Sequence, residues 1–261
     1  AIEHSRMLRR QAVGAVRAWA VSGRPAAQAW AASGQRRSLA MMVSPDCLKT
    51  MSTKLAAEPH IDALKLKTDD ADPVKFTYKQ LNRQVTGFAK GLAGADFQPG
   101  SKIVIWTKDI AEGVVAQLAA LKIGCKVTVL DAAASEADLA KALVDARAIL
   151  FSPTLLPNNA TMAMVKKVVP ALEEVEEDGY RVVSSPEFPS LRWVMTTGFY
   201  GKKGMIKYQH VFSYDDVTPL PEVAAGSITF AGPGTPKEFK STPIIDETVT
   251  LVPDEAKFAE L

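Results

Sequence analysis

Short apolar segments alternate with amphipathic helical patterns along the middle of the chain, and this alternation restricts the fold more than any other feature. Residues 102–107, 126–130 and 148–151 are apolar runs of strand length, separated by stretches with helical spacing. Strands and helices that alternate at this distance form a parallel sheet with right-handed crossovers. We therefore predict an α/β fold with a doubly wound, mostly parallel sheet, to which residues 191–196 and 227–230 add two further strands.

The helix predicted over residues 77–94 has clear signals at both ends. Its apolar residues recur on one face of a helix. Thr77 followed by Gln80 has the pattern of a capping box, and Gly94 is a typical helix terminator.

Two later helices have predicted N-caps at Asp109 and Ser135. The second of them is predicted to bury Leu139, Leu143 and Val144. Both helices fall between predicted strands, as a parallel sheet requires.

Weaker patterns predict the remaining elements. Residues 51–63 are expected to start as a helix that breaks near Pro59, and residues 158–175 to form a helix interrupted at Pro170. Residues 69–73 are expected to form an acidic turn, and residues 180–183 are a candidate minor strand.

The composition is that of a globular protein, with 47% hydrophobic and 23% charged residues among 261. Two cysteines, Cys47 and Cys125, form neither a disulfide framework nor a zinc-binding pattern and indicate reduced thiols outside the secretory pathway. The histidines His4, His60 and His210 are scattered, so no metal site is predicted. No run of 18 apolar residues occurs, and no membrane span is predicted.

The first 45 residues differ from the rest of the chain in charge. They hold seven Arg, no Lys and one Glu, a local charge of 7 − 1 = +6, so the other residues carry 2 − 6 = −4. A body with this charge has no electrostatic reason to bind nucleic acid. Residues 7–19 can form a helix with Arg on one side, which is typical of a mitochondrial transit peptide.

Three interpretations of this arm stay open. It is a targeting sequence kept as a docking arm, a basic amphipathic helix that lies on anionic lipid, or an RNA-contacting tail of the ribosomal kind. The first of these is our leading interpretation.

Four segments of the body carry a resemblance to a known family: 76–85 (Phe-Thr-Tyr-Lys-Gln-Leu-Asn-Arg-Gln-Val), 98–106 (Gln-Pro-Gly-Ser-Lys-Ile-Val-Ile-Trp), 115–124 (Val-Ala-Gln-Leu-Ala-Ala-Leu-Lys-Ile-Gly) and 189–198 (Pro-Ser-Leu-Arg-Trp-Val, then Thr-Gly). In order and spacing they resemble the opening of the N-terminal domain of acyl-CoA synthetases, the adenylate-forming, AMP-binding enzymes. The resemblance implies a partial adenylate-forming N-domain, and the matching segments correspond to scaffold rather than to ligand-binding residues.

The phosphate loop that the resemblance implies would lie at residues 229–238, Thr-Phe-Ala-Gly-Pro-Gly-Thr-Pro-Lys-Glu, and it is eroded. Such a loop binds ATP through Ser, Thr and Gly, whose N–H and hydroxyl groups donate to phosphate, and through a Pro-Lys-Gly ending. Apolar residues, a proline without an N–H group and a final glutamate replace much of this pattern. The vestigial positions are Gly232, Gly234, Thr235 and Lys237.

The family's later motifs, its adenine and ribose contacts and its C-terminal lid with a catalytic lysine, find no counterpart in residues 242–261. We therefore predict no catalytic residue and no cofactor, and interpret the chain as a pseudoenzyme. Its predicted organisation is a basic arm at 1–45, an acyl-CoA-synthetase-like α/β domain at 46–215 and a Pro-rich C-terminal extension at 216–261.

The predicted function is that of a non-catalytic accessory subunit of a large mitochondrial assembly, with a respiratory complex or the ATP synthase favoured. Its expected partners are other protein subunits, with peripheral lipid contact through the arm, and its expected location is the inner membrane or the matrix. Two alternatives remain: an acyl- or nucleotide-binding protein with residual ligand binding, and an RNA-contacting subunit of the mitochondrial ribosome.

Overall fold

The computed structural model describes seven stretches of the chain, all in the compact unit Ser38–Leu261: residues 41–68, 71–108, 110–172, 182–198, 203–215, 219–234 and 237–239. The predictions made for residues 1–40, for Asp109 as a helix cap and for the sequence after residue 239 lie outside these residues.

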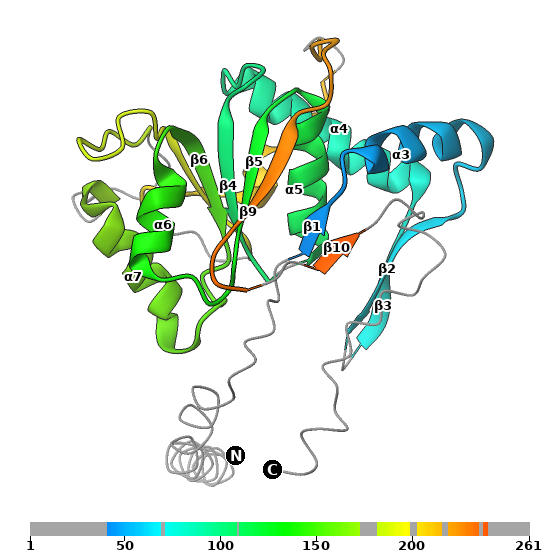
Figure 1. Ribbon diagram of the computed structural model, residues 1–261. Coiled ribbons are helices and arrows are strands. Elements are labelled where there is room, and N and C mark those ends of the chain that lie inside the picture. Colours follow the sequence, from blue (N-terminus) through cyan, green and yellow to red (C-terminus); the bar gives the residue numbers. More distant parts are fainter. Residues whose placement is uncertain are drawn as a thin grey trace, which may run out of the picture. The chain divides into compact units, whose positions relative to one another are not determined.

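A six-stranded parallel sheet forms the centre of the fold, as the sequence predicts (Figure 1). Its strands lie side by side in the order β8-β7-β6-β4-β5-β9, and every neighbouring pair is parallel. The strands are β4 (Lys102–Trp106), β5 (Lys126–Leu130), β6 (Ala146–Phe151), β7 (Trp193–Thr196), β8 (Ile206–Lys207) and β9 (Ser227–Ala231). Within this sheet the chain starts at β4, adds β5 on one side and then β6, β7 and β8 on the other, and returns to place β9 beside β5. Residues 216–261 contribute β9.

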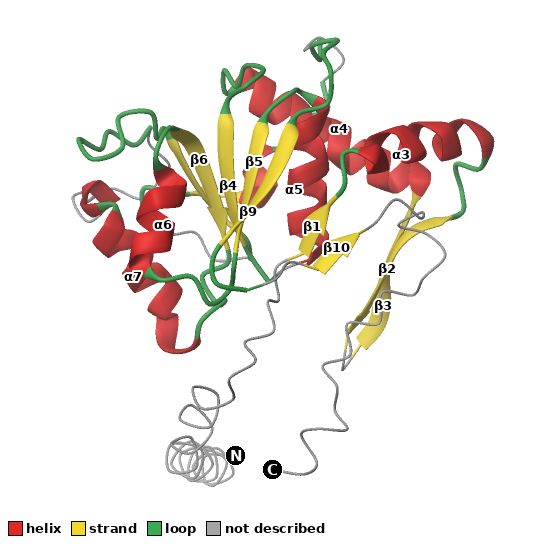
Figure 2. Cartoon of the chain, in the orientation of Figure 1, coloured by secondary structure: helices red, strands yellow, loops and turns green. Residues whose placement is uncertain are grey.

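Helices cover both faces of this sheet, so the predicted doubly wound architecture is confirmed (Figure 2). On one face α4 (Tyr78–Gly94) and α5 (Ile110–Lys122) bury their apolar residues against Ile103, Ile105 and their neighbours. On the other face α6 (Glu136–Leu143) and α7 (Ala160–Val168) pack against Val104, Trp106 and Phe151. Successive residues of a strand point to opposite faces, and this alternation fills both cores.

Shorter elements complete the fold. Helix α3 (Asp46–Ala57) and the antiparallel hairpin β2 (Asp62–Thr68) and β3 (Ala71–Thr77) precede α4. The 3₁₀ segments η1 (Pro157–Asn159) and η2 (Pro170–Leu172) flank α7, and α8 (Tyr208–Val211) follows β8. A second small sheet joins β1 (Met41–Val43) to β10 (Lys237–Phe239) in parallel. No helix among the described residues is long and apolar enough to cross a membrane.

The predicted N-caps are confirmed where the structure describes them, whereas Gly94 lies in the last turn of α4 and Ala95 is its C-cap. The Thr77 hydroxyl accepts from Gln80 N at 3.2 Å while Thr77 N donates to Gln80 Oε1 at 2.9 Å, which is a complete capping box. Ser135 and Asp138 form the same arrangement at the start of α6. The break predicted at Pro170 is also present, between α7 and η2.

Three predictions of detail are wrong. Val144 is 53% exposed rather than buried, because α6 ends at Leu143 and the backbone of Val144 has left the helix. Val182 and Val183 belong to no strand, although Val183 N donates one hydrogen bond to Arg192 O. Within the predicted acidic turn, residues 71–73 already form part of β3, where the proline favours extended backbone.

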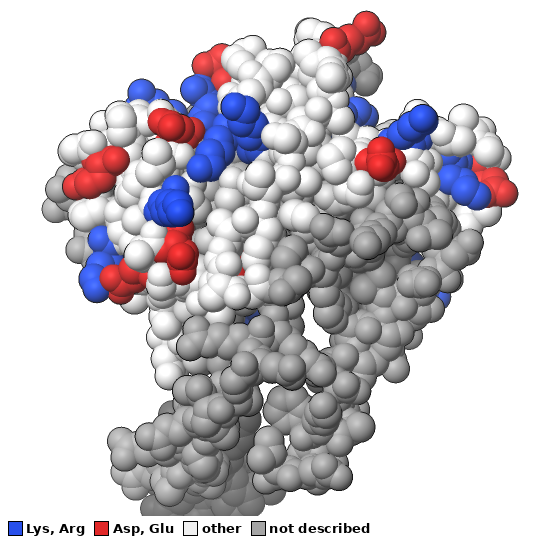
Figure 3. Space-filling view, in the orientation of Figure 1, with Lys and Arg blue, Asp and Glu red and all other residues white. Residues whose placement is uncertain are grey.

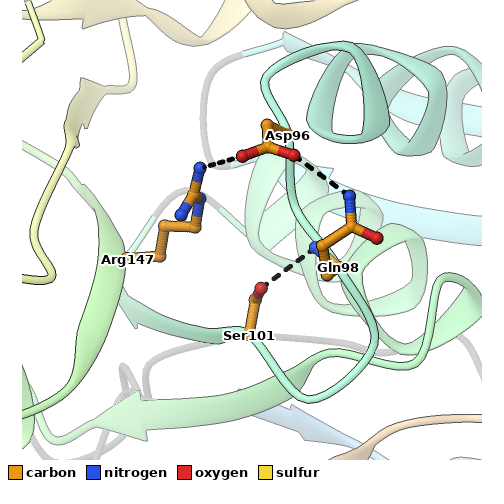
Figure 4. Close-up of polar contacts among 4 residues, drawn as sticks. All are labelled: Asp96, Gln98, Ser101 and Arg147. Atoms are coloured by element: carbon orange, nitrogen blue, oxygen red, sulfur yellow. Dashed lines mark hydrogen bonds and ion pairs between the residues drawn. The ribbon is translucent and has the colours of Figure 1, made fainter.

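The amino edge of the sheet is held by a small polar network (Figure 4). Arg147 at the start of β6 pairs with Asp96 at 2.8 Å, Gln98 Nε2 donates to the same carboxylate at 3.1 Å, and Gln98 N donates to the Ser101 hydroxyl at 3.0 Å. The Arg147–Asp96 ion pair is partly exposed, so it contributes about 1 kcal/mol or less to the free energy of unfolding. These contacts position the turn that leads into β4.

Helix α4 and the segment that follows β8 approach each other closely at a glycine. A Cβ built on Gly91 would lie 1.5 Å from the carbonyl oxygen of Val211. This approach lets Phe88 stack on Tyr208 at a ring distance of 5.0 Å. Gly94, in the last turn of the same helix, faces no atom within 4 Å.

We predict that Gly91→Ala destabilises the protein by about 3 kcal/mol, since either α4 or the backbone at Val211 must move. Gly94→Ala is the matched control, and it should be neutral or stabilising by up to about 1 kcal/mol because alanine is the better helix former. Urea unfolding followed by circular dichroism measures both. Equal midpoints for the two variants would contradict the close approach.

We also predict that the thiol of Cys125 is unreactive in the folded protein. Burial raises its pKa from 9.0 to about 12, and its Sγ lies 3.8 Å from the carbonyl oxygen of Gln98. Thiolate is the reactive form, so Ellman's reagent at pH 8 should label Cys125 only after unfolding.

The raised pKa of Cys125 also predicts how the stability of the fold changes at alkaline pH. The pKa of Cys125 is higher in the folded state than in the unfolded state. The protonated thiol therefore contributes fully to the free energy of unfolding below pH 9, and this contribution is lost as the pH rises toward 12. The unfolding midpoint of the native protein should fall over this range relative to that of Cys125→Ala. A parallel decline in both would show that Cys125 ionisation plays no part.

Candidate functional site

The vestigial phosphate loop follows β9 at the carboxyl edge of the sheet. Gly232, Pro233 and Gly234 are the described loop residues, and Lys237 begins β10. Phe230 and Ala231 lie in strand β9 itself, and Phe230 packs against the core on the α4–α5 face. Ligands of open parallel sheets bind outside the carboxyl ends of the strands, so the loop lies at the edge where a ligand is expected.

The loop closes over a buried carboxylate. Asp131 directly follows β5, is 1% exposed and accepts a hydrogen bond from Gly234 N on its Oδ2 at 2.6 Å. Its other oxygen, Oδ1, lies 3.2 Å from the donating N of Ala133. The anion that the loop contacts is therefore a side chain of the protein itself.

The backbone of Asp131 is fixed as firmly as its side chain. Its N–H donates to Ala231 O at 2.9 Å, which continues the β5–β9 ladder by one residue. Its carbonyl oxygen accepts from the indole Nε1 of Trp106 at 2.8 Å and from Ala134 N at 3.0 Å. These bonds hold the carboxylate in place.

Gly232 allows the loop to turn over Asp131. Its φ is +130°, a value that side chains rarely adopt, and a Cβ built on it would lie 2.4 Å from the Cβ of Asp131. The glycine therefore serves the close contact with Asp131 in this chain.

The structure describes three of the four residues that the sequence analysis assigned to the vestigial loop. Gly232 and Gly234 lie together in the loop as expected. Thr235 lies outside the described residues. The backbone of Lys237 is paired with Met41 of β1, and its side chain is not described.

Two positions of the described loop offer no free N–H group. Pro233 has no N–H group, and the N–H of Gly234 already donates to a carboxylate. Upstream in β9, the Thr229 hydroxyl lies 3.3 Å from that of Thr128 and 3.4 Å from Val127 O, so it too has partners.

Hydroxyl side chains also gather at the ends of β6 and β7. Ser152, Thr196 and Thr197 are all buried. Thr197 N donates to Phe151 O, and Ser152 Oγ lies 3.3 Å from the Thr154 hydroxyl. Thr196 Oγ1 is buried without a hydrogen-bond partner. The predicted turn at Thr197-Gly198 is present, with Gly198 at φ +87°.

Other catalytic constellations do not form among the described residues. His60 and His210 are both exposed, and no three His, Cys, Asp or Glu side chains of the described chain could share a metal ion. Burial raises the pKa of Cys47 and Cys125, so neither thiol is an activated nucleophile.

The surface around strand β9 carries little charge. Figure 3 shows the same face as Figure 1 and is white over this strand. A group of Lys and Arg lies beside its upper end, and further charged residues lie over α6–α7 and α3. The strand residues themselves, Ser-Ile-Thr-Phe-Ala, include no ionisable side chain.

Asp131 is the site residue that the sequence interpretation missed. Its only local signal is its place directly after an apolar strand, at the edge where β9 also ends. The contact joins residues 103 positions apart, so it depends on the pairing of β5 with β9.

Comparison with known proteins identifies the family. The family model described as AMP-binding enzyme matches residues 53–198, which is more than half of the chain. Acetyl-coenzyme A synthetase 1 of Pseudomonas aeruginosa is 38% identical over 79 residues, which are 30% of this chain and 12% of that enzyme. The acetyl-coenzyme A synthetase of Ralstonia pickettii is 32% identical over 87 residues, 33% of this chain and 13% of the relative.

Solved structures agree on the fold. The acetoacetyl-CoA synthetase from Streptomyces lividans superposes with a TM-score of 0.54 at 17% identity, over 68% of this chain and 26% of that one. Apo MbtA of Mycobacterium smegmatis gives 0.52 at 21% identity, over 80% and 34%. The match thus spans a minor part of each relative, and the family model ends before the loop at 232–234. By its match over residues 53–198 and by this shared N-domain fold, the chain belongs to the AMP-binding enzyme family, with acyl-CoA synthetases among its relatives.

Proposed function

We propose that this chain is a non-catalytic member of the AMP-binding family that serves as an accessory subunit of a large mitochondrial assembly, a respiratory complex or the ATP synthase. The observation that carries the proposal is the hydrogen bond from Gly234 N to the Asp131 carboxylate. A phosphate loop whose amide already binds an internal anion is poorly suited to ATP.

At this loop the phosphates of ATP would lose hydrogen bonds and would also be repelled by a carboxylate. A charge-assisted hydrogen bond contributes about 1.5–3 kcal/mol. Pro233 has no N–H group to offer a ligand, and the N–H of Gly234 already donates to Asp131. A phosphate about 4 Å from the Asp131 carboxylate would meet a repulsion of about 4 kcal/mol at an effective dielectric constant of about 20. Together these terms would remove several orders of magnitude in affinity.

The edge of the sheet supports a role in an assembly. Strand β9 pairs with β5 on one side, and no described strand pairs with its other side. Its sequence lacks the charged residues and prolines that usually protect such an edge. Val223, which precedes this strand, is exposed as well. A protein partner that covers this edge would satisfy both its backbone and its apolar side chains.

The basic arm supports a mitochondrial location. Residues 1–45 carry a charge of +6 and combine arginine with alanine and serine, a composition typical of mitochondrial targeting sequences. Retained as an arm, the same residues could bind neighbouring subunits or anionic lipid.

Two alternatives each have an observation in their favour. The unpartnered hydroxyl of Thr196 at the carboxyl edge favours residual binding of an acyl or nucleotide ligand. The arginines of the arm favour contact with RNA, as in a mitochondrial ribosomal subunit.

We predict that the purified chain binds neither ATP with magnesium nor acyl-CoA at micromolar concentration, as measured by isothermal titration calorimetry. A cooperative unfolding transition of the same sample verifies that the chain is folded. Micromolar binding that disappears in Lys237→Ala would show a working nucleotide site and would overturn the proposal.

We further predict that the native protein in mitochondrial extracts migrates with other proteins in a large species whose size resists ribonuclease. Native gel electrophoresis before and after the nuclease, followed by mass spectrometry of the band, measures this. Collapse of the species by ribonuclease would favour the RNA-contacting alternative. Migration at the size of a single chain, or absence from mitochondria, would contradict the accessory-subunit role.

A further inference from the structure

We propose that the Asp131 carboxylate is a built-in substitute for phosphate, and that its charge excludes polyphosphate ligands from the loop after β9. This inference rests on the proposed loss of nucleotide binding and gives it a cause in one side chain.

The contact has the geometry of an anion bound to a phosphate loop. Gly234 N donates to Oδ2 at 2.6 Å, which is short for an amide donor. The φ of +130° at Gly232 brings the loop backbone directly over the Asp131 Cβ. One loop amide, that of Gly234, donates to the carboxylate, and backbone N–H groups of such turns can also bind phosphate.

The carboxylate is ordered before any ligand arrives. Ala133 N donates to its second oxygen, and Trp106 Nε1 and Ala231 O hold its backbone. A ligand phosphate would therefore have to displace a carboxylate that accepts two hydrogen bonds, from Gly234 and Ala133, on a backbone held by three more. Rotation of the side chain away from the loop would also break the Ala133 contact.

No described cation compensates this charge at the loop. The described ion pairs of the chain join residues of α3, of α6 with α7, and of the amino edge, and none involves Asp131. We infer that the carboxylate repels a second anion that approaches Gly234.

The test uses the full chain, with Asp131→Asn as the main variant. Asparagine keeps the size of the side chain and removes its charge; its one oxygen can accept from either Gly234 or Ala133, and its NH₂ group takes the other position. Asp145→Asn is the matched control: Asp145 is exposed at the opposite edge of the sheet, and its φ of +58° suits asparagine. Both variants have the same net charge.

Calorimetric titration with pyrophosphate, and with ATP and magnesium, at low salt measures the affinity. We expect no micromolar binding by the native chain, at least about tenfold tighter binding by Asp131→Asn, and no gain in Asp145→Asn. An equal gain in both variants would assign the effect to net charge and overturn the inference. A folded Asp131→Asn that binds no better would overturn it and leave the proposed function intact, whereas micromolar binding by the native chain would end both.

A measurement on the unaltered protein keeps the inference testable if Asp131→Asn fails to fold. The amide of Gly234 lies in a partly exposed loop, yet its bond to Asp131 should slow its hydrogen exchange well below that of an open loop. Exchange at the rate of a free amide, followed by nuclear magnetic resonance, would show that the contact is absent and would sink the inference.

Discussion

The parallel pairing of β5 with β9 is the interaction on which the rest of the site depends. Its register sets Leu130 beside Ala231, so the residue after each strand, Asp131 and Gly232, meets the other. The pairing itself depends on Gly226, because a Cβ there would lie 1.8 Å from the carbonyl oxygen of Cys125. A distant segment thus closes the sheet and brings its loop onto an internal carboxylate.

The two helical layers explain how the fold can keep its family's form while its loop changes. Each core is built from the strand residues that point to one face together with the apolar stripes of two helices. Neither core requires a phosphate-binding loop, because the loop lies outside the carboxyl ends of the strands. Selection on packing alone can therefore preserve the scaffold of an AMP-binding enzyme, which is consistent with the accessory role that we propose.

Local signals in the sequence predicted most of the elements, for physical reasons that act over a few residues. The capping boxes at Thr77 and Ser135 involve partners three residues away, and the apolar stripe of α4 repeats within one helix. One prediction failed at the end of a helix, where a shift of one residue decides whether a side chain is buried. Val144 continues the apolar pattern of α6, but the helix ends one residue before it and turns its side chain to solvent.

The sequence by itself determined the α/β class and the N-caps at Thr77 and Ser135, because these follow from residue type and short-range spacing. Only the tertiary structure decided where β9 lies in the sheet and which group meets the loop. Strand order and the contact of Asp131 with Gly234 join residues about a hundred positions apart. Such contacts are selected by the packing of the whole domain, and local propensity carries no information about them.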